Sequence, residues 1–198
     1  MTLDRDARAA QHPAVWRVVA RRMALDARPW LRGWFEDIAL PDGRVIENFV
    51  SLEMPDVAVV VALTSHGDVV VERGYKHGPR RACVSLPAGY VESGEEPLDA
   101  ARRELREETG YVSDDWAPLG RFTADGNRGG GVSHLYLAQA SHRLADPDDH
   151  DLETVTVDVM PFSDLLSAVR SGDVAVLSNA AAIGLAAVTL RSAQEGTT

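Results

Sequence analysis

The sequence predicts an α/β fold in which a mixed β-sheet lies between helices. Residues 57–64 are almost all β-branched or small and apolar, as expected for a strand buried on both faces. Pro97 and Gly110 bracket a helix, because proline is favoured in a first turn and glycine just past a last turn. Two more helices are predicted near the C-terminus, a short one over residues 161–170 and a longer, alanine-rich one over residues 179–191.

The N-terminal part of the chain is predicted to form β-strands. Residues 16–25 and 31–40 mix apolar and polar side chains and are separated by Arg28 and Pro29. A Pro-Asp-Gly turn at residues 41–43 then leads into residues 44–52, which is the pattern of a β-hairpin. We therefore expect a β extension over residues 1–52, followed by a larger domain over residues 53–198.

Later segments predict the rest of the sheet. A His-Gly-Asp turn at residues 66–68 separates residues 57–64 from the apolar run at residues 69–73. Val155, Val157 and Val159 alternate with polar residues, which is typical of a half-buried strand. The remaining strand candidates are residues 119–123, 133–140 and 152–160.

Composition restricts the class of protein. A chain of 198 residues is long enough for one core domain with an extension. The net charge of −10 opposes nonspecific binding to nucleic acid. Cys83 is the only cysteine, so an intrachain disulfide is impossible and a reducing cytoplasm fits. The first residues lack an apolar signal core, and no apolar stretch reaches the roughly 18 residues of a spanning helix. We expect a soluble, cytoplasmic protein without a membrane segment.

The helix predicted after Pro97 carries an acidic face. At about 100° per residue, Glu104, Glu107 and Glu108 fall within an arc of about 100°, beside an apolar stripe that includes Leu105. Like charges at this spacing repel by roughly a few tenths of a kcal/mol, so their clustering favours a bound cation. Magnesium prefers carboxylate and phosphate oxygens. The pattern predicts a metal and phosphate site, with ordinary Glu–Arg pairs on an exposed helix as the alternative.

The spacing around this helix resembles the Nudix box at every fixed position. Gly89 is followed by five residues, Glu95, seven residues and then Arg-Glu-Leu-Arg-Glu-Glu-Thr-Gly-Tyr from Arg103 to Tyr111. So many fixed positions are far more specific than a lone glycine motif. The chain therefore resembles the Nudix hydrolases, which implies a Nudix-type α/β/α sandwich, with a mixed sheet, for residues 53–198.

The resemblance implies roles for residues of the box. The expected metal-binding set is Glu104, Glu107, Glu108 and the carbonyl of Gly89, with Mg²⁺ as the metal and Mn²⁺ as its alternative. Gly89 also permits close approach of the backbone. Arg103 lies four residues before Glu107, so an ion pair along the helix is expected to hold that carboxylate in a ligating conformation. Glu95 is expected either to support the metal-binding residues from behind or to fix the loop in which it lies.

A second resemblance, to the ADP-ribose pyrophosphatase branch, lies upstream of the box. Residues 69–76 followed by Leu-Pro-Ala-Gly at residues 86–89 look like the segment that supplies basic contacts to the diphosphate. Arg73 and Lys76 are the candidates for those contacts, with solvated residues at a strand end as the alternative. The branch usually carries a proline near residues 125–131, and this chain has none between Pro118 and Pro147.

The resemblance also implies a proton acceptor on a late loop outside the box, at residues 145–153. Glu153 and Asp148 are the leading candidates, while Asp149 and Asp151 also qualify. The segment lacks the glutamate pair of similar enzymes, so the acceptor is left open among these residues. A solvated turn is the alternative.

Substrate recognition requires a cation for phosphate and a flat apolar surface for a base. Trp34 and Phe35 are the candidates for stacking the base, with core packing as the alternative. Arg128 is the candidate cation. It lies in a glycine-rich segment, residues 125–131, that is either a mobile loop closing over the substrate or a hairpin tip.

The resemblance implies a magnesium-dependent hydrolase that cleaves the diphosphate linkage of a nucleoside diphosphate derivative into two phosphate monoesters. ADP-ribose or a similar nucleoside-diphosphate sugar is the leading substrate. The alternatives are a diphosphatase for a dinucleotide or a damaged triphosphate, and a noncatalytic nucleotide-binding regulatory module. Similar enzymes further imply a homodimer in which the N-terminal strands are exchanged.

Overall fold

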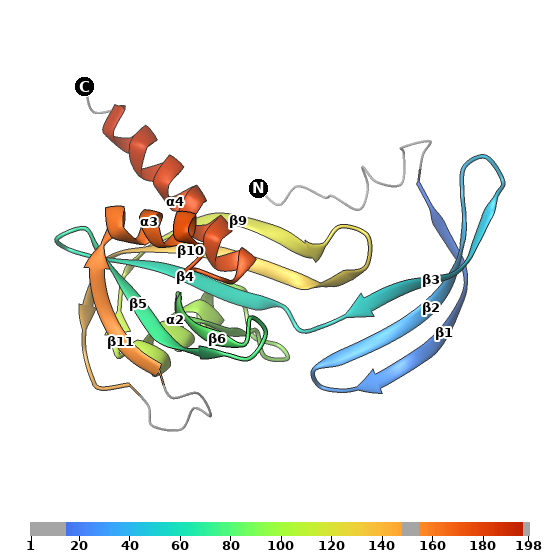
Figure 1. Cartoon of the computed structure of the whole chain (residues 1–198), viewed down its shortest axis with the longest axis horizontal. Helices are drawn as coiled ribbons and strands as arrows, with labels where there is room; N and C mark the ends of the chain where they lie inside the picture. Colours follow the sequence, from blue (N-terminus) through green and yellow to red (C-terminus); the bar gives the residue numbers. More distant parts are fainter. Residues whose placement is uncertain (1–14, 148–154, 196–198) are drawn as a thin grey trace. The chain divides into compact units, whose positions relative to one another are not determined.

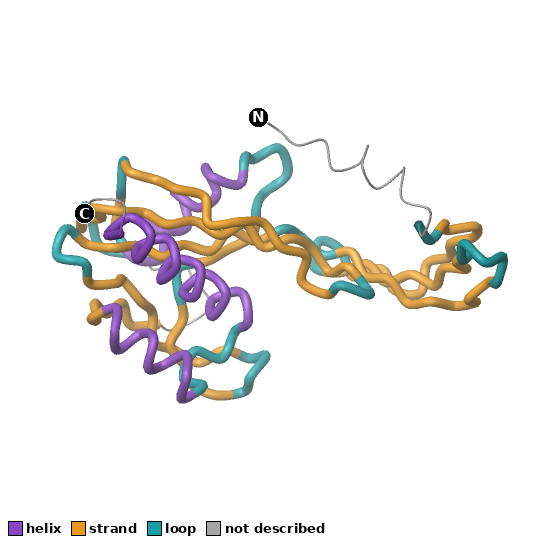
Figure 2. Tube along the Cα trace, turned by 90° about the horizontal axis from the view of Figure 1, so that it is seen from above, coloured by secondary structure: helices purple, strands orange, loops and turns teal. Residues whose placement is uncertain are grey.

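The computed structural model describes residues 15–147 and 155–195, and the chain divides into two compact units. The first unit contains Met1–Pro55 and Asp125–Gly131, and the second contains Asp56–Ala124 and Val132–Thr198. Figure 2 shows that the helices belong to the second unit, whereas the described part of the first unit consists of strands and loops.

Three antiparallel strands form most of the first unit (Figure 1). They are β1 (Arg17–Ala27), β2 (Leu31–Ala39) and β3 (Val45–Glu53), with β2 in the middle. In the turn between β2 and β3, the Arg44 N–H donates to Asp42 Oδ1 at 3.0 Å, as the turn residues predicted. The three predicted strands are confirmed, with small shifts of their ends.

A hairpin tip completes the first unit, between β9 (Asp115–Asp125) and β10 (Gly129–Arg143). Asp125 Oδ1 accepts hydrogen bonds from the N–H groups of Asn127 and Arg128, at 2.7 and 2.8 Å. The Arg128 carbonyl accepts from the Leu52 N–H at 2.7 Å, and Gly129 pairs with Leu52. Of the two interpretations of this glycine-rich segment, the hairpin tip is the one observed, and residues 129–131 belong to a strand.

A mixed sheet forms the centre of the second unit. Its strand order is β10, β4 (Val57–Thr64), β5 (Asp68–Lys76) and β11 (Val155–Pro161). Strand β10 runs parallel to β4, and the other neighbours are antiparallel. Three short strands join this sheet: β6 (Arg81–Ser85) pairs with β5, β7 (Ala88–Tyr90) with β4, and β8 (Tyr111–Val112) with β10.

Helices cover both faces of this sheet (Figure 1). On one face, Ala58 and Val60 of β4 pack with Leu105 of α2 (Pro97–Thr109). On the other face, Val59 and Val61 pack with side chains of α3 (Phe162–Ser171) and α4 (Leu177–Glu195). Successive residues of β4 thus enter two separate cores, because neighbours in a strand point to opposite faces. The predicted α/β/α sandwich with a mixed sheet is confirmed.

The helix ends follow the predicted signals. Gly110 has φ 74° and its N–H bonds to the Arg106 carbonyl, while Pro97 occupies the first turn, so α2 has the predicted bounds. Helix α4 is longer than predicted at both ends, starting at Leu177 and running to Glu195. Within the described residues, no helix is both long enough and apolar enough to span a membrane.

The sequence did not predict β6 or β7, and so it did not place Gly89 in a strand. Ala88 and Gly89 form strand pairs with Val59 and Ala58, and the Val60 N–H donates to the Pro87 carbonyl at 3.0 Å. These partners come from β4, which is distant in the sequence. Long-range hydrogen bonds, rather than a local pattern, therefore make this segment a strand.

Candidate active site

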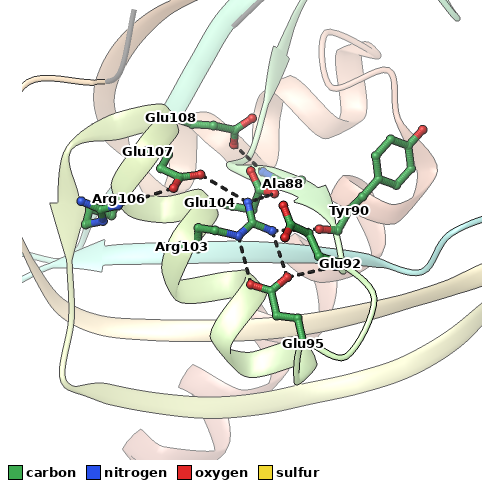
Figure 3. Close-up of polar contacts among 9 residues, drawn as sticks. All are labelled: Ala88, Tyr90, Glu92, Glu95, Arg103, Glu104, Arg106, Glu107 and Glu108. Atoms are coloured by element: carbon green, nitrogen blue, oxygen red, sulfur yellow. Dashed lines mark hydrogen bonds and ion pairs between the residues drawn. The ribbon is translucent and has the colours of Figure 1, made fainter. Parts of the chain in front are cut away.

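Arg103 of α2 is the centre of the polar network drawn in Figure 3. Its Nε and Nη2 donate to Glu95 Oε1 and Oε2 at 3.0 and 3.1 Å, and Nη2 also donates to the Tyr90 carbonyl at 3.0 Å. Its Nη1 donates to Glu104 Oε1 at 2.7 Å and to Glu107 Oε2 at 3.3 Å. The predicted ion pair between Arg103 and Glu107 is confirmed. One guanidinium ties the loop before α2 to two carboxylates of the box.

These contacts set the charge of each group. Pairing, first with Glu95, raises the pKa of Arg103 above its ordinary value, and the same contact lowers the pKa of Glu95. Glu104 behaves differently, because its burial raises the pKa more than Arg103 lowers it. The contact therefore favours the charged forms of Arg103 and Glu95, whereas burial favours the protonated form of Glu104.

Gly89 lies directly against Glu104. A Cβ atom built on Gly89 would lie 2.0 Å from Glu104 Oε1, so the backbone reaches the carboxylate only because residue 89 has no side chain. The pairing of Gly89 with Ala58 places β7 beside the helix. The close backbone approach expected at Gly89 is confirmed.

Glu108 lies on the buried side of α2. Its Oε2 accepts a hydrogen bond from the Ala88 N–H at 2.8 Å (Figure 3). Burial, and next the negative charge of Glu72 on β5, raise the pKa of Glu108 to about 9, while the Ala88 N–H and the charge of Lys76 oppose the rise. Glu107 is more open, with 34% of its side chain exposed. The three glutamates of the box therefore differ in their burial and in how readily they ionise.

The atoms that could bind a metal at this site are of a type that suits a divalent cation. The three glutamates and the Gly89 carbonyl offer oxygen atoms only, which hard cations such as Mg²⁺ and Mn²⁺ prefer. Burial raises the pKa of both Glu104 and Glu108, so a cation would replace protons there. Among residues 15–147 and 155–195, no three His, Cys, Asp or Glu side chains are already grouped as metal ligands. Arg103 already orients two of these carboxylates, Glu104 and Glu107.

Each residue of the segment that leads into β7, residues 85–88, forms a hydrogen bond with another part of the second unit. The hydrogen bonds run from Ser85 Oγ to Glu72 Oε2 (3.4 Å), from the Leu86 N–H to Asn179 Oδ1 (2.9 Å), from the Val60 N–H to the Pro87 carbonyl (3.0 Å) and from the Ala88 N–H to Glu108 Oε2 (2.8 Å). Partners on β4, β5, α2 and α4 thus fix the backbone that presents Gly89.

The two basic candidates on β5 differ. Arg73 Nε forms an ion pair with Asp158 Oδ2 on the neighbouring β11 at 2.9 Å, so a phosphate would compete with Asp158 for this guanidinium. Lys76 lies within electrostatic reach of Glu108, whose ionised form its charge favours. Lys76 therefore acts electrostatically on a glutamate of the box, whereas Arg73 forms its ion pair with a residue of the neighbouring strand β11.

The remaining substrate candidates belong to the first unit. The guanidinium carbon of Arg21 lies 3.8 Å from the centre of the Trp34 ring, and that of Arg22 lies 4.4 Å from the centre of the Phe35 ring. Arg128 Nη1 pairs with Asp125 Oδ2 at 3.5 Å. An arginine thus already contacts each candidate ring. The candidate proton acceptors, Asp148, Asp149, Asp151 and Glu153, lie outside the described residues.

Sequence reasoning missed Glu72. The run Val-Val-Val-Glu-Arg resembled a strand that ends in solvent, but Glu72 is only 1% exposed. Glu72 and Val70 point to the same face of β5, and Val70 belongs to the core beneath α2. The sequence signal that could have found Glu72 is the alternation of side chains along a strand, which places residue 72 on the same face as Val70.

Comparison with known proteins agrees with the box and the fold. A family model described as the NUDIX domain matches residues 53–179. The ADP-ribose pyrophosphatase of Bacillus subtilis is 30% identical over 142 residues, which cover 71% of this chain and 76% of that protein. The ADP-ribose pyrophosphatase of Mycobacterium tuberculosis is 30% identical over 156 residues, covering 77% and 73%. A solved structure of an ADP compounds hydrolase shares the fold, with a TM-score of 0.75 at 18% identity over 89% of this chain and 95% of that chain.

Proposed function

Because the chain belongs to the Nudix family of hydrolases, we propose that it cleaves the diphosphate linkage of a nucleoside diphosphate derivative. The substrate would be ADP-ribose or a similar nucleoside-diphosphate sugar, and the products two phosphate monoesters. Nudix hydrolases generally use divalent metal ions. We assign that role to Mg²⁺, with Mn²⁺ as a substitute.

One observation carries the proposal: Arg103 gathers Glu95, Glu104 and Glu107 on one guanidinium, while Glu108 is held separately by the Ala88 N–H. A surface helix with ordinary ion pairs would not need a glycine opposite its carboxylate, nor a buried glutamate. The arrangement supports Glu104, Glu107, Glu108 and the Gly89 carbonyl as the metal-binding set.

The bound cation would neutralise the diphosphate and lower the pKa of an attacking water. The protein's own contribution is to hold the oxygen ligands in place. Arg103 stays charged and positions Glu104 and Glu107, Gly89 leaves room for Glu104, and the Ala88 N–H orients Glu108. For the proton acceptor we keep Glu153 and Asp148.

We assign the substrate-binding residues by the chemical groups of the substrate that they could contact. Lys76 and Arg73 would contact the diphosphate, Trp34 or Phe35 would stack the base, and Arg128 would add a cation. The two relatives named ADP-ribose pyrophosphatases support the choice of ADP-ribose. The net charge of −10 argues against nucleic acid as a partner.

We assign catalysis to residues 53–198 and a homodimer contact to the β extension of residues 1–52. All eleven residues of β1 are exposed, among them Val18, Val19, Met23 and Leu25, which leaves an apolar edge strand available to a second copy. Light scattering after size exclusion tests this assignment, and a monomer at working concentration would contradict it. The single, buried cysteine is consistent with the cytoplasm as the compartment.

The decisive experiment incubates the purified protein with Mg²⁺ and ADP-ribose in ¹⁸O-labelled water. We expect AMP and a ribose phosphate, with the label in one of the two monoesters, because water attacks phosphorus. Parallel reactions contain a UDP-sugar, a dinucleotide and an oxidised nucleoside triphosphate. Hydrolysis of the triphosphate but not of ADP-ribose would overturn the substrate assignment. Nucleotide binding with no monoester formed would instead support a regulatory module.

A further inference from the structure

Asn179 is a buried amide in the first turn of α4, where the other side chains of its stripe are apolar. It is only 4% exposed. Ala182, Ile183 and Ala186 follow it at the spacing of one helical face, and all three are fully buried in the core beneath α3 and α4. An apolar residue at position 179 would continue this stripe. Because burying an amide is costly unless it is hydrogen-bonded, its presence here requires a physical reason.

The partner of Asn179 lies on the segment that leads to the box. Asn179 Oδ1 accepts a hydrogen bond from the Leu86 N–H at 2.9 Å, and Leu86 is itself buried. The chain that leads into α4 follows the same segment, because the Val84 N–H donates to the Asp173 carbonyl at 3.0 Å and Val84 pairs with Val174. This chain therefore runs beside β6, and the contacts with it continue as far as Leu86.

The position of Leu86 affects the following residues because Pro87 comes next. Pro87 has no N–H, so Leu86 and Ala88 supply the nearest backbone donors on either side of it. The Leu86 N–H is held from α4, and the Ala88 N–H is held by Glu108 of α2 at 2.8 Å. Proline fixes its own φ and restricts the residue before it, so a rotation at Leu86 is passed on to Ala88 and Gly89. Helices on opposite faces of the sheet thus hold the two ends of one stiff segment.

From this placement we propose that Asn179 is a positioning residue of the metal site. By holding the Leu86 N–H, it sets where the Ala88 N–H and the Gly89 carbonyl lie, and the Ala88 N–H in turn orients Glu108. Since Asn179 belongs to α4 and Glu108 to α2, this influence passes through the backbone between them. The proposal rests on the proposed function, because it concerns the same site.

The first test measures amide hydrogen exchange in the metal-free protein by nuclear magnetic resonance. In Asn179→Ala the Leu86 N–H loses its acceptor, and we expect the Ala88 N–H to exchange about 10-fold faster relative to the amides of β4. The comparison with β4 cancels a general loss of stability. The matched control is Ile183→Val, which removes a buried methylene from the same stripe but keeps the hydrogen bond to Leu86. The relative exchange of Ala88 should be unchanged in this control.

The second test measures Mn²⁺ binding without substrate, by the electron paramagnetic resonance signal of free Mn²⁺ during a titration. The Mn²⁺ affinity of Asn179→Ala should fall about 10-fold, the lower end of the range for groups that support a metal site from behind. Asn179→Asp keeps an acceptor oxygen at the same place and should recover most of this affinity. Ile183→Val should bind Mn²⁺ as the wild type does, because a residue that only stabilises the core lowers the melting temperature without changing the site of the folded protein.

Three outcomes would overturn the proposal: wild-type Mn²⁺ affinity in Asn179→Ala, unchanged relative exchange of the Ala88 N–H in that variant, or an equal loss of affinity in Ile183→Val. If Asn179→Ala fails to fold, Asn179→Leu decides by the same measurements. Leucine has the branched shape of asparagine and suits the apolar stripe, but it offers no acceptor to the Leu86 N–H.

Both measurements are independent of the reaction. A wild-type protein whose Mn²⁺ affinity depends on Asn179 but which hydrolyses no nucleoside diphosphate derivative would contradict the proposed function and leave this inference standing. Hydrolysis of ADP-ribose by the wild type, combined with full Mn²⁺ affinity in Asn179→Ala, would do the reverse.

Discussion

Arg103 donates to both carboxylate oxygens of Glu95, at 3.0 and 3.1 Å, and so anchors the loop before α2 to the helix itself. The two-point contact uses the planar fork of the guanidinium, which a lysine ammonium cannot reproduce. Because the same guanidinium also reaches Glu104 and Glu107, a disturbance at Glu95 is transmitted to groups proposed to bind metal.

The first prediction concerns this anchor. Glu95→Gln and Arg103→Lys should each lower kcat about 10- to 100-fold, because the metal-binding carboxylates lose their fixed orientation. Steady-state kinetics with ADP-ribose and Mg²⁺ measures the effect, and the apparent affinity for Mg²⁺ should weaken in parallel. Asp99→Asn on the same helix is the control, since the Asp99 side chain is 62% exposed and forms its ion pair with Arg102. Full activity of Glu95→Gln would show that the anchor is not required.

The second prediction concerns the ligands themselves. Glu107→Gln and Glu108→Gln should each lower kcat by at least about 10²- to 10³-fold, because each removes negative charge that holds the cation near the reacting phosphate. Circular dichroism should show an unchanged fold, since glutamine fills the same space. Near-normal turnover in either variant would remove that residue from the metal-binding set.

The third prediction is a pH dependence of the metal-free protein. Burial and the charge of Glu72 raise the pKa of Glu108 to about 9, from the 4.5 that is ordinary for a glutamate. Between these values the folded chain binds more protons than the unfolded chain, so the free energy of unfolding falls as pH rises through this window. The contribution of Glu108 to the free energy of unfolding is complete below about pH 4.5 and is lost as the pH approaches 9.

Thermal unfolding in a chelating buffer from pH 6 to pH 9 measures this dependence. Glu108→Gln cannot ionise, so its melting temperature should fall less over the same range than that of the wild type. Parallel curves for the two proteins would contradict the raised pKa. Adding Mg²⁺ should oppose the loss at high pH, because the cation replaces the proton at Glu108.

The fourth prediction addresses the proton acceptor, which lies outside the described residues. If Glu153 accepts the proton of the attacking water, Glu153→Gln should lower kcat by about 10²- to 10⁴-fold and remove the acidic limb of the pH–rate profile. Asp148→Asn should then keep most of the rate. The opposite result would move the role to Asp148, and full activity of both variants would exclude this pair.

The box and its helix were accessible to sequence reasoning because their signals are local. Pro97 and Gly110 mark the two ends of α2, and residues 57–64 carry the composition of a buried strand. The contacts of Arg103 with Glu107 could also be predicted, since four residues span one helical turn.

The rest depends on contacts between distant segments. Ala88 and Gly89 became a strand only through β4, and Glu72 is buried because its face of β5 packs against α2. No window of a few residues contains this information. The glycines at residues 129–131 left a mobile loop and a hairpin tip both open for a similar reason, since their strand pairing begins at the distant Leu52.

The last prediction uses the glycine that faces the helix. In Gly89→Ala the new Cβ would lie 2.0 Å from Glu104 Oε1, so the Glu104 carboxylate must move away. The obstructing atoms are at the end of a flexible side chain, and Gly89 has no left-handed φ, so the fold should tolerate the change. The melting temperature should therefore stay close to that of the wild type while kcat and Mg²⁺ affinity fall. Gly78→Ala, where a Cβ meets nothing within 4 Å, is the matched control and should leave all three quantities unchanged. A fully active Gly89→Ala would mean that cation binding does not require the Glu104 carboxylate to lie against residue 89.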